Sequence, residues 1–179
     1  MTDDEHKQLA SEFYKGSVLI GLDRMVARKF YMDLSLKHIE EQTGEAPYFE
    51  VLAVFGTVVA AHLALVASWV LSVLAFGWWS VLAIPASTLV YFLFGGHSSL
   101  PNHRLLGVSL VLVAIVIAMR LGAFPSNYVA WYCISFAFSL WAARFVYFAA
   151  GHFLRAFVLR NKKAYEMLSS YIDVKQLSQ

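Results

Sequence analysis

Three ionisable side chains of this chain lie within long apolar stretches, where they could do chemistry. They are His62, Arg120 and Arg144. A histidine in such surroundings can relay protons, gate a path or contact a ligand, or it can stay neutral and bond to a neighbouring carbonyl or hydroxyl group. An arginine there either extends its long side chain to the nearest polar layer or faces inward. If it faces inward, an ion, a lipid phosphate or a substrate must supply the countercharge, because residues 51–150 contain no Asp or Glu.

A second polar group lies between two apolar stretches, in the segment 95–104. It contains His97, His103 and Arg104, preceded by a pair of glycines. Glycines let backbone amides turn toward an anion, and an arginine adds a fork for phosphate, so the segment could bind an anion or a lipid headgroup. A plain turn is the alternative. The histidine spacing matches no zinc signature and no carboxylate or thiol completes a set, so we expect no metal and no other cofactor.

Four apolar stretches must position these side chains. They span about 51–76, 78–94, 105–121 and 128–150. A helix rising 1.5 Å per residue needs about 20 apolar residues to cross a hydrocarbon core of about 30 Å. The chain is 59% hydrophobic and 15% charged. We therefore predict an all-α, polytopic integral membrane protein whose four spans lie within residues 50–150.

The segments on either side, 1–49 and 151–179, are charged and predicted to be cytoplasmic and helical. Lys and Arg residues gather beside the ends of the spans at Lys37, at Arg104 and from Arg155 to Lys163. Such residues favour the cytoplasmic side of the membrane. Both termini and the 95–104 segment are thus expected in the cytoplasm, and the spans in the inner or plasma membrane with its lipids as partners. A net charge of +2 argues against a nucleic-acid partner.

The flanking sequence predicts specific helix ends. Thr2 can cap a first helix, because carboxylates follow it in the opening turn. A second helix is expected from Gly16 to about Gln42, stopped by Gly44 and Pro47. The last span is expected to continue to Leu177 as one cytoplasmic helix. Its seam includes Asn161, a residue type that sets register in coiled coils.

Small residues recur every fourth position in the first span. We call them the small-residue ladder: Gly56, Ala60, Ala64, Ser68 and Ser72. In lipid, close backbone approach must supply the contact energy between helices. The ladder therefore predicts either packing against the fourth span or a face for neighbouring subunits. Pro85 in the second span removes a backbone donor and predicts a kink, which serves packing or a gating hinge.

Three functions of different classes are compatible with these patterns. The preferred one is a homo-oligomeric channel or membrane effector with a cytoplasmic sensor or docking region, because the ladder and the C-terminal segment both suit assembly. An accessory or assembly subunit of a larger membrane complex needs only packing faces. A small membrane enzyme or transporter for a lipid headgroup or anion ranks last, because the spans lack carboxylates for acid-base chemistry. The sequence indicates no catalytic residue.

Overall fold

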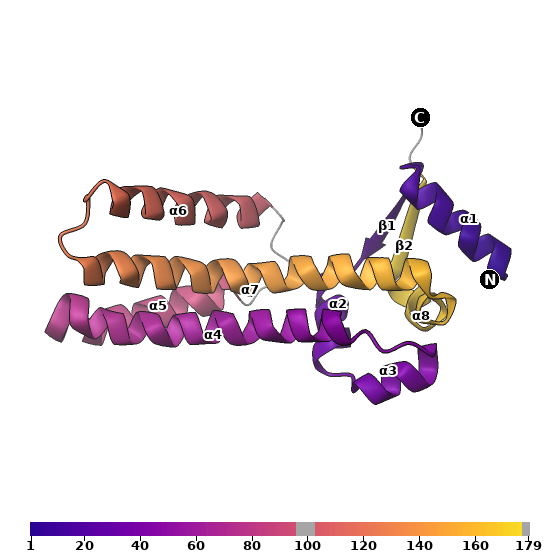
Figure 1. Ribbon diagram of the computed structural model, residues 1–179, viewed down its shortest axis with the longest axis horizontal. Helices are drawn as coiled ribbons and strands as arrows, with labels where there is room; N and C mark the ends of the chain where they lie inside the picture. Colours follow the sequence, from indigo (N-terminus) through magenta and orange to yellow (C-terminus); the bar gives the residue numbers. More distant parts are fainter. Residues whose placement is uncertain (96–102, 177–179) are drawn as a thin grey trace. The chain divides into compact units, whose positions relative to one another are not determined.

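The computed structural model describes residues 1–95 and 103–176, and this part of the chain is mostly helical (Figure 1). It divides into two compact units. The terminal unit combines Met1–Phe55 with Tyr147–Gln179, and the central unit is Gly56–Val146. The two ends of the sequence therefore fold together.

The elements follow one another along the chain with short connections. In order they are α1 (Asp3–Tyr14), β1 (Val18–Leu22), α2 (Arg24–Met32), α3 (Leu36–Thr43), α4 (Tyr48–Phe76), a 3-10 turn (Gly77–Trp79), α5 (Ser80–Gly95), α6 (His103–Arg120), α7 (Asn127–Arg160), α8 (Lys162–Leu168), a second 3-10 turn (Ser169–Tyr171) and β2 (Ile172–Gln176). Each of the helices α4 to α7 contains most of one predicted apolar stretch, and α7 continues ten residues beyond the predicted end at 150.

The central unit is made of two helical hairpins. The ring of His62 on α4 meets the ring of Tyr91 on α5 at a centroid distance of 5.8 Å, so α5 folds back along α4 after the 3-10 turn. The indole nitrogen of Trp141 on α7 donates to the hydroxyl of Ser109 on α6 over 3.0 Å, so α7 folds back along α6. The fully buried side chains on α4 and α7 include Ala61, Ser68, Ser72, Ala130 and Ser139. Their small size permits close helix packing.

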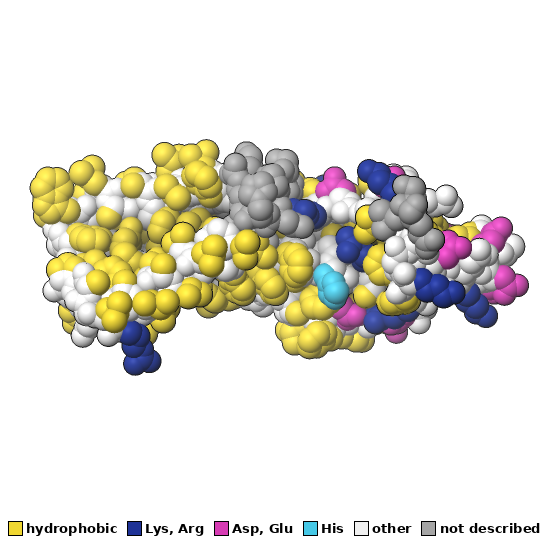
Figure 2. All heavy atoms as spheres, turned by 90° about the horizontal axis from the view of Figure 1, so that it is seen from above, with side chains coloured by type: hydrophobic (Ala, Val, Ile, Leu, Met, Phe, Trp, Pro, Cys, Tyr) yellow, Lys and Arg dark blue, Asp and Glu magenta, His cyan; other side chains and the backbone are white. Residues whose placement is uncertain are grey.

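The outer surface of the central unit is apolar, and hydrophobic side chains cover its helices in Figure 2. Two helical stretches of the described chain, Tyr48–Phe94 and Asn127–Arg160, are long and apolar enough to cross a membrane. Their most apolar windows are only 22% and 50% buried. The first stretch includes both α4 and α5, and Leu105–Arg120 in α6 is shorter. Because α4 and α5 count as one stretch and α6 is too short, two helical stretches of the described chain, not four, are long and apolar enough by this criterion to cross a membrane.

In the terminal unit, strands from opposite ends of the chain pair. β1 and β2 form a two-stranded antiparallel sheet in which Val18 lies opposite Gln176 and Leu22 opposite Ile172. Val18 and Ile20 of β1 are buried with Leu159 of α7. Leu9, Ala10 and Phe13 of α1 pack against this cluster. Burial of these apolar side chains holds the sheet, because a lone pair of strands is marginally stable in water.

The predicted caps of the flanking helices are confirmed. The hydroxyl of Thr2 accepts from the amide of Glu5 over 3.3 Å, and the Glu5 carboxylate accepts from the amide of Thr2, which makes a capping box. α3 ends at Gly44, whose φ of 75° is the left-handed conformation that favours glycine at a helix C-terminus.

The predicted second helix from Gly16 to Gln42 is wrong. This region forms β1, α2 and α3 instead. Residues Val18–Leu22 are VLIGL, and Val18 and Ile20 are buried whereas Leu19 and Gly21 are exposed. That alternation suits a strand, and Asp23 then caps α2 through the amide of Met25.

The predicted continuous helix to Leu177 is also wrong, because α7 ends at Arg160. Asn161 is extended, with φ −125° and ψ 109°, and its side-chain oxygen accepts from the amide of Ala164 over 3.1 Å. Its amide group donates to the carbonyl of Thr43 over 3.1 Å. Asn161 is therefore the N-cap of α8, not a coiled-coil residue. Together with the sheet, this corrects the all-α prediction to a mostly helical fold.

Candidate functional site

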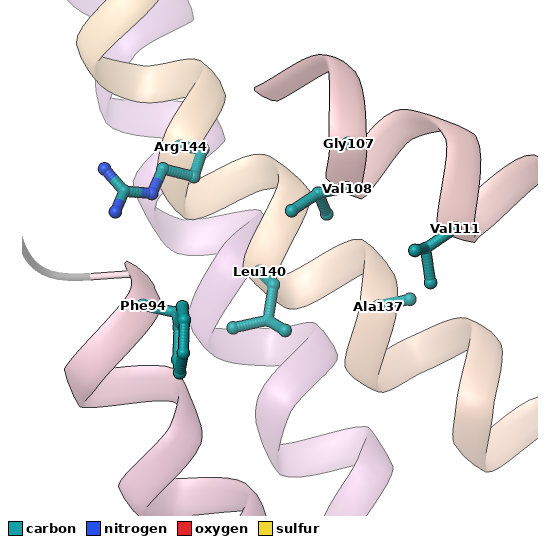
Figure 3. A pocket seen from close by; sticks show the side chains of 7 residues that line it. All are labelled: Phe94, Gly107, Val108, Val111, Ala137, Leu140 and Arg144. Atoms are coloured by element: carbon teal, nitrogen blue, oxygen red, sulfur yellow. The ribbon is translucent and has the colours of Figure 1, made fainter. Parts of the chain in front are cut away.

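The site with the clearest chemical character is a cavity of about 380 Å³ in the central unit, which we call the Arg144 cavity (Figure 3). Three helices line it. Phe94 comes from α5, and α6 and α7 contribute the other lining residues, which are Gly107, Val108, Val111, Ala137, Leu140 and Arg144. Apart from the arginine, every lining side chain is apolar or absent.

Helix periodicity explains how this wall is formed. Ala137, Leu140 and Arg144 are spaced by three and four residues on α7, so they lie on one face of that helix. Val108 and Val111 are similarly spaced on α6. No residue of the segment 105–120 is buried, which shows that α6 packs loosely on its neighbours. Loose packing of α6, together with the missing side chain at Gly107, leaves the space.

Arg144 is the charged member of this wall. Only 8% of its surface is exposed, so Arg144 is a buried residue. An arginine buried among apolar side chains is costly and usually interacts with an anion or with polar backbone groups. The guanidinium group is charged at all ordinary pH values and presents several donors. It therefore gives one end of an otherwise apolar cavity a fixed positive charge.

His62 is placed apart from this cavity. Its Nδ1 lies 2.7 Å from the carbonyl oxygen of Val58, one turn earlier on α4. In the tautomer that carries hydrogen on Nδ1, the ring donates to that carbonyl. A neighbouring carbonyl is one of the partners expected for His62 from the sequence, and the ring is exposed. The edge-to-face contact with Tyr91 holds the ring in place.

The remaining candidates do not join the Arg144 cavity in the described chain. Arg120 is exposed in the last turn of α6. His97 lies outside the described residues, and for His103 and Arg104 only the backbone at the start of α6 is described. The predicted anion site in that segment therefore stays a prediction. Within residues 1–95 and 103–176, no cluster of His, Cys, Asp and Glu could hold a metal ion.

The small-residue ladder differs in burial along its length. Ser68 and Ser72 are fully buried, Ala60 and Ala64 are half-buried, and Gly56 is exposed. Four residues turn a helix by about 400°, so each step of the ladder advances about 40° around α4. The ladder thus winds from the outer surface into the helix packing, and its first part stays uncovered.

Pro85 lies inside α5, as predicted. The hydroxyl groups of Ser87 and Thr88 donate to the carbonyl of Ile84 over 2.9 and 2.7 Å. The two hydroxyl groups and the carbonyl of Ile84 are thus hydrogen-bonded within α5, next to the position where Pro85 removes a backbone donor.

Sequence reasoning missed a charged cluster in the terminal unit. One guanidinium nitrogen of Arg160 lies 2.8 Å from Glu45 and 3.0 Å from Glu50. Desolvation lowers the pKa of Arg160, but the hydrogen bond to Glu50 and the charges of both carboxylates raise it more, so the pKa lies above its ordinary value. Burial, followed by the charge of Glu50, raises the pKa of the neighbouring Tyr31. The signal in the sequence was the pair of acidic residues at the start of α4, Glu45 just before it and Glu50 in its first turn, which call for a basic partner.

A second missed group connects α1 to the end of α7 and the start of α8. Lys162 lies 2.7 Å from Asp3, and Nε2 of His6 lies 2.9 Å from the carbonyl oxygen of Val158. The hydrogen bond and charge of Lys162 lower the pKa of Asp3, and the hydrogen bond to Asp3 raises the pKa of Lys162. Polar groups of α1 thus bond near the C-terminal end of a long apolar helix.

Comparison with known proteins gave no match, whether with family models, with curated proteins or with solved structures. What the chain does must therefore be inferred from its own residues.

Proposed function

We propose that this chain is a four-span integral membrane protein that self-associates in the cell membrane and carries a cytoplasmic unit built from both of its ends. The observation that carries the proposal is the antiparallel pairing of β1 with β2. Strands that pair must lie on the same side of a membrane. The chain between them therefore crosses an even number of times.

Four crossings fit the helices better than two. The contact between His62 and Tyr91 makes α4 and α5 a hairpin, and the bond from Trp141 to Ser109 makes α6 and α7 another. The stretch Tyr48–Phe94 reverses at the 3-10 turn, so it supplies two crossings. Exposed Trp78 and Trp131 suit the membrane interface at the turns of these hairpins.

The surface of the central unit supports a lipid environment. Leu63 and Val70 on α4 are 64% and 59% exposed. Contiguous apolar surface of this kind is unfavourable in water and marks a membrane or protein contact. Lys and Arg residues in the terminal unit favour the cytoplasm for both ends.

The topology is tested with single cysteines in a Cys133→Ala background. Gln8→Cys and Ser170→Cys mark the terminal unit, and Trp78→Cys and Ala123→Cys mark the two hairpin turns. In intact cells, a membrane-impermeant maleimide should label positions 78 and 123 but not 8 or 170. Unequal labelling of the two ends, or extraction of the protein by an alkaline wash, contradicts the proposal.

Self-association is supported by the uncovered part of the small-residue ladder. Gly56 is exposed, and a Cβ added there would meet no atom within 4 Å in the monomer. A larger side chain is thus compatible with the folded monomer but blocks close approach of a second helix. This makes Gly56 a position that separates assembly from folding.

The test of self-association is the native mass of the protein in nanodiscs. We expect a uniform oligomer that Gly56→Leu reduces to monomer, and conductance in liposomes that this substitution abolishes. Ala114→Leu, at an exposed position of α6, is the matched control and should leave both unchanged. A wild-type monomer contradicts self-association, and isolation only within a mixed complex favours the accessory-subunit function.

A further inference from the structure

We propose that the Arg144 cavity binds one acyl chain of an anionic phospholipid, with the lipid phosphate held by Arg144. This inference depends on the proposed membrane location but not on self-association. It assigns a ligand class to a cavity whose walls come from three helices of the central unit (Figure 3).

The walls select an apolar occupant. Phe94, Val108, Val111, Ala137 and Leu140 offer no side-chain hydrogen bond to water. Water is stable in a protein cavity only where it finds two to four polar partners. A hydrocarbon chain makes dispersion contacts with all five side chains and requires none. The surrounding bilayer supplies such chains at high concentration.

The size of the cavity limits the occupant. Its volume of about 380 Å³ lies near the lower end of the range for small-molecule sites. The space therefore suits a single chain and not both chains of a phospholipid. The second chain of the same lipid can stay in the bilayer against the exposed apolar side chains of α6, which include Leu110 and Val113.

The charge selects the headgroup. Arg144 carries a positive charge beside the apolar walls, in a unit whose sequence contains no Asp or Glu. A phosphodiester accepts two hydrogen bonds from arginine in a planar, bidentate arrangement. A lipid with net negative charge can therefore contact both Arg144 and the apolar walls, whereas free phosphate can contact only Arg144.

Gly107 provides a way to fill the cavity without touching Arg144. It lines the cavity, and a Cβ added there would meet no atom within 4 Å. A leucine at this position therefore extends into open space instead of clashing with a neighbouring helix. The substitution should exclude the acyl chain while keeping the positive charge.

The experiment is native mass spectrometry of the full chain in detergent, with added dioleoylphosphatidylglycerol or dioleoylphosphatidylcholine as the probe. We expect the wild-type protein to retain the anionic lipid roughly tenfold better, the factor that one charge-assisted hydrogen bond supplies. Arg144→Leu should abolish this preference, Arg144→Lys should keep part of it, and Gly107→Leu should weaken binding of both lipids. Glycerophosphate, which lacks chains, should not compete.

Arg120→Leu is the matched control, because Arg120 is an exposed arginine on the wall-forming helix α6 but does not line the cavity. Equal loss of the preference in Arg120→Leu, or an unchanged preference in Arg144→Leu, overturns the inference. If Arg144→Leu does not fold, unaltered lipid binding by Gly107→Leu overturns it independently. Failure of lipid binding in a chain that withstands the alkaline wash rejects this inference and leaves the membrane proposal intact.

Discussion

Arg160, Asn161 and Lys162 are three consecutive residues that all bond to residues distant in the sequence. Arg160 binds Glu45 and Glu50, Asn161 binds the carbonyl of Thr43, and Lys162 binds Asp3. Partly exposed ion pairs contribute little individually, often less than about 1 kcal/mol. Their value here is geometric, because they fix where α7 ends and where the chain turns into α8.

The attachment of α1 should depend on pH. Its pair with Lys162 lowers the pKa of Asp3 from 3.8, so this contribution is present above that value and is lost as the pH falls through the lowered pKa. The same pair raises the pKa of Lys162 from 10.5, so the contribution is lost as the pH rises through the raised pKa. Bonds to Thr2 lower the pKa of Glu5, which adds to the loss at acid pH.

Amide hydrogen exchange of residues 3–14, corrected for the intrinsic effect of pH, measures this dependence. Protection should be highest between those two limits and fall on both sides. Asp3→Asn should reduce the protection of residues 3–14 within that range. In this variant, protection should also change less when Lys162 loses its proton. Protection that is equal in the two proteins at neutral pH would show that the pair does not hold α1.

The candidate site could be found from the sequence in part. Arg144 was identified because an arginine within an apolar stretch is conspicuous and costly. Phe94 and Gly107 were not, because an apolar residue or glycine on a predicted span looks the same whether it lines a cavity or faces lipid. Only the packing of α5, α6 and α7 brings these residues together, and periodicity along one helix carries no information about it.

At the scale of elements, the sheet is the feature that most affects the terminal unit. Ile20 is 1% exposed at the centre of β1, beside Leu159 of α7. Ile20→Ala removes buried methyl groups and leaves a cavity, which costs about 2–4 kcal/mol. Leu19→Ala is the matched control, because Leu19 is 50% exposed on the other face of the same strand.

Hydrogen exchange read by mass spectrometry distinguishes these two variants. With Ile20→Ala, protection should fall together in peptides covering 18–22 and 172–176, although these are far apart in sequence. Tryptophan fluorescence should change little, because all five tryptophans lie in the central unit. A loss confined to β1 would argue that the sheet is not one cooperative element.

The helices of the central unit were predictable and the sheet was not. Long apolar runs with polar ends fix α4, α5, α6 and the start of α7 within a few residues, since hydrophobicity alone specifies them, but they do not fix the end of α7. Val18–Leu22 is too short for its alternation to outweigh the surrounding helical pattern, and its partner Ile172–Gln176 is distant in sequence. Asn161 fitted a coiled-coil seam by spacing, but its side chain stabilises a helix N-terminus instead.

At the scale of the whole molecule, each end of the chain needs the other. Deletion of residues 1–46 removes β1, α1 and the ring of Phe30, which packs 5.9 Å from the ring of Phe157. We expect the deleted protein to keep its central unit while residues 161–176 become sensitive to protease. Adding residues 1–55 as a separate co-expressed fragment should restore resistance. Full resistance of the deleted protein without the fragment would contradict this interdependence.

In the proposed topology β2 follows all of the membrane-spanning helices in the sequence, so the terminal unit could be completed only after those helices had been inserted. A polypeptide that skipped one insertion would leave its two strands in different compartments, permanently unable to join. The small sheet would then act as a proofreading step in biogenesis, because misinserted copies would expose unfolded ends to quality-control proteases while correctly inserted ones would not.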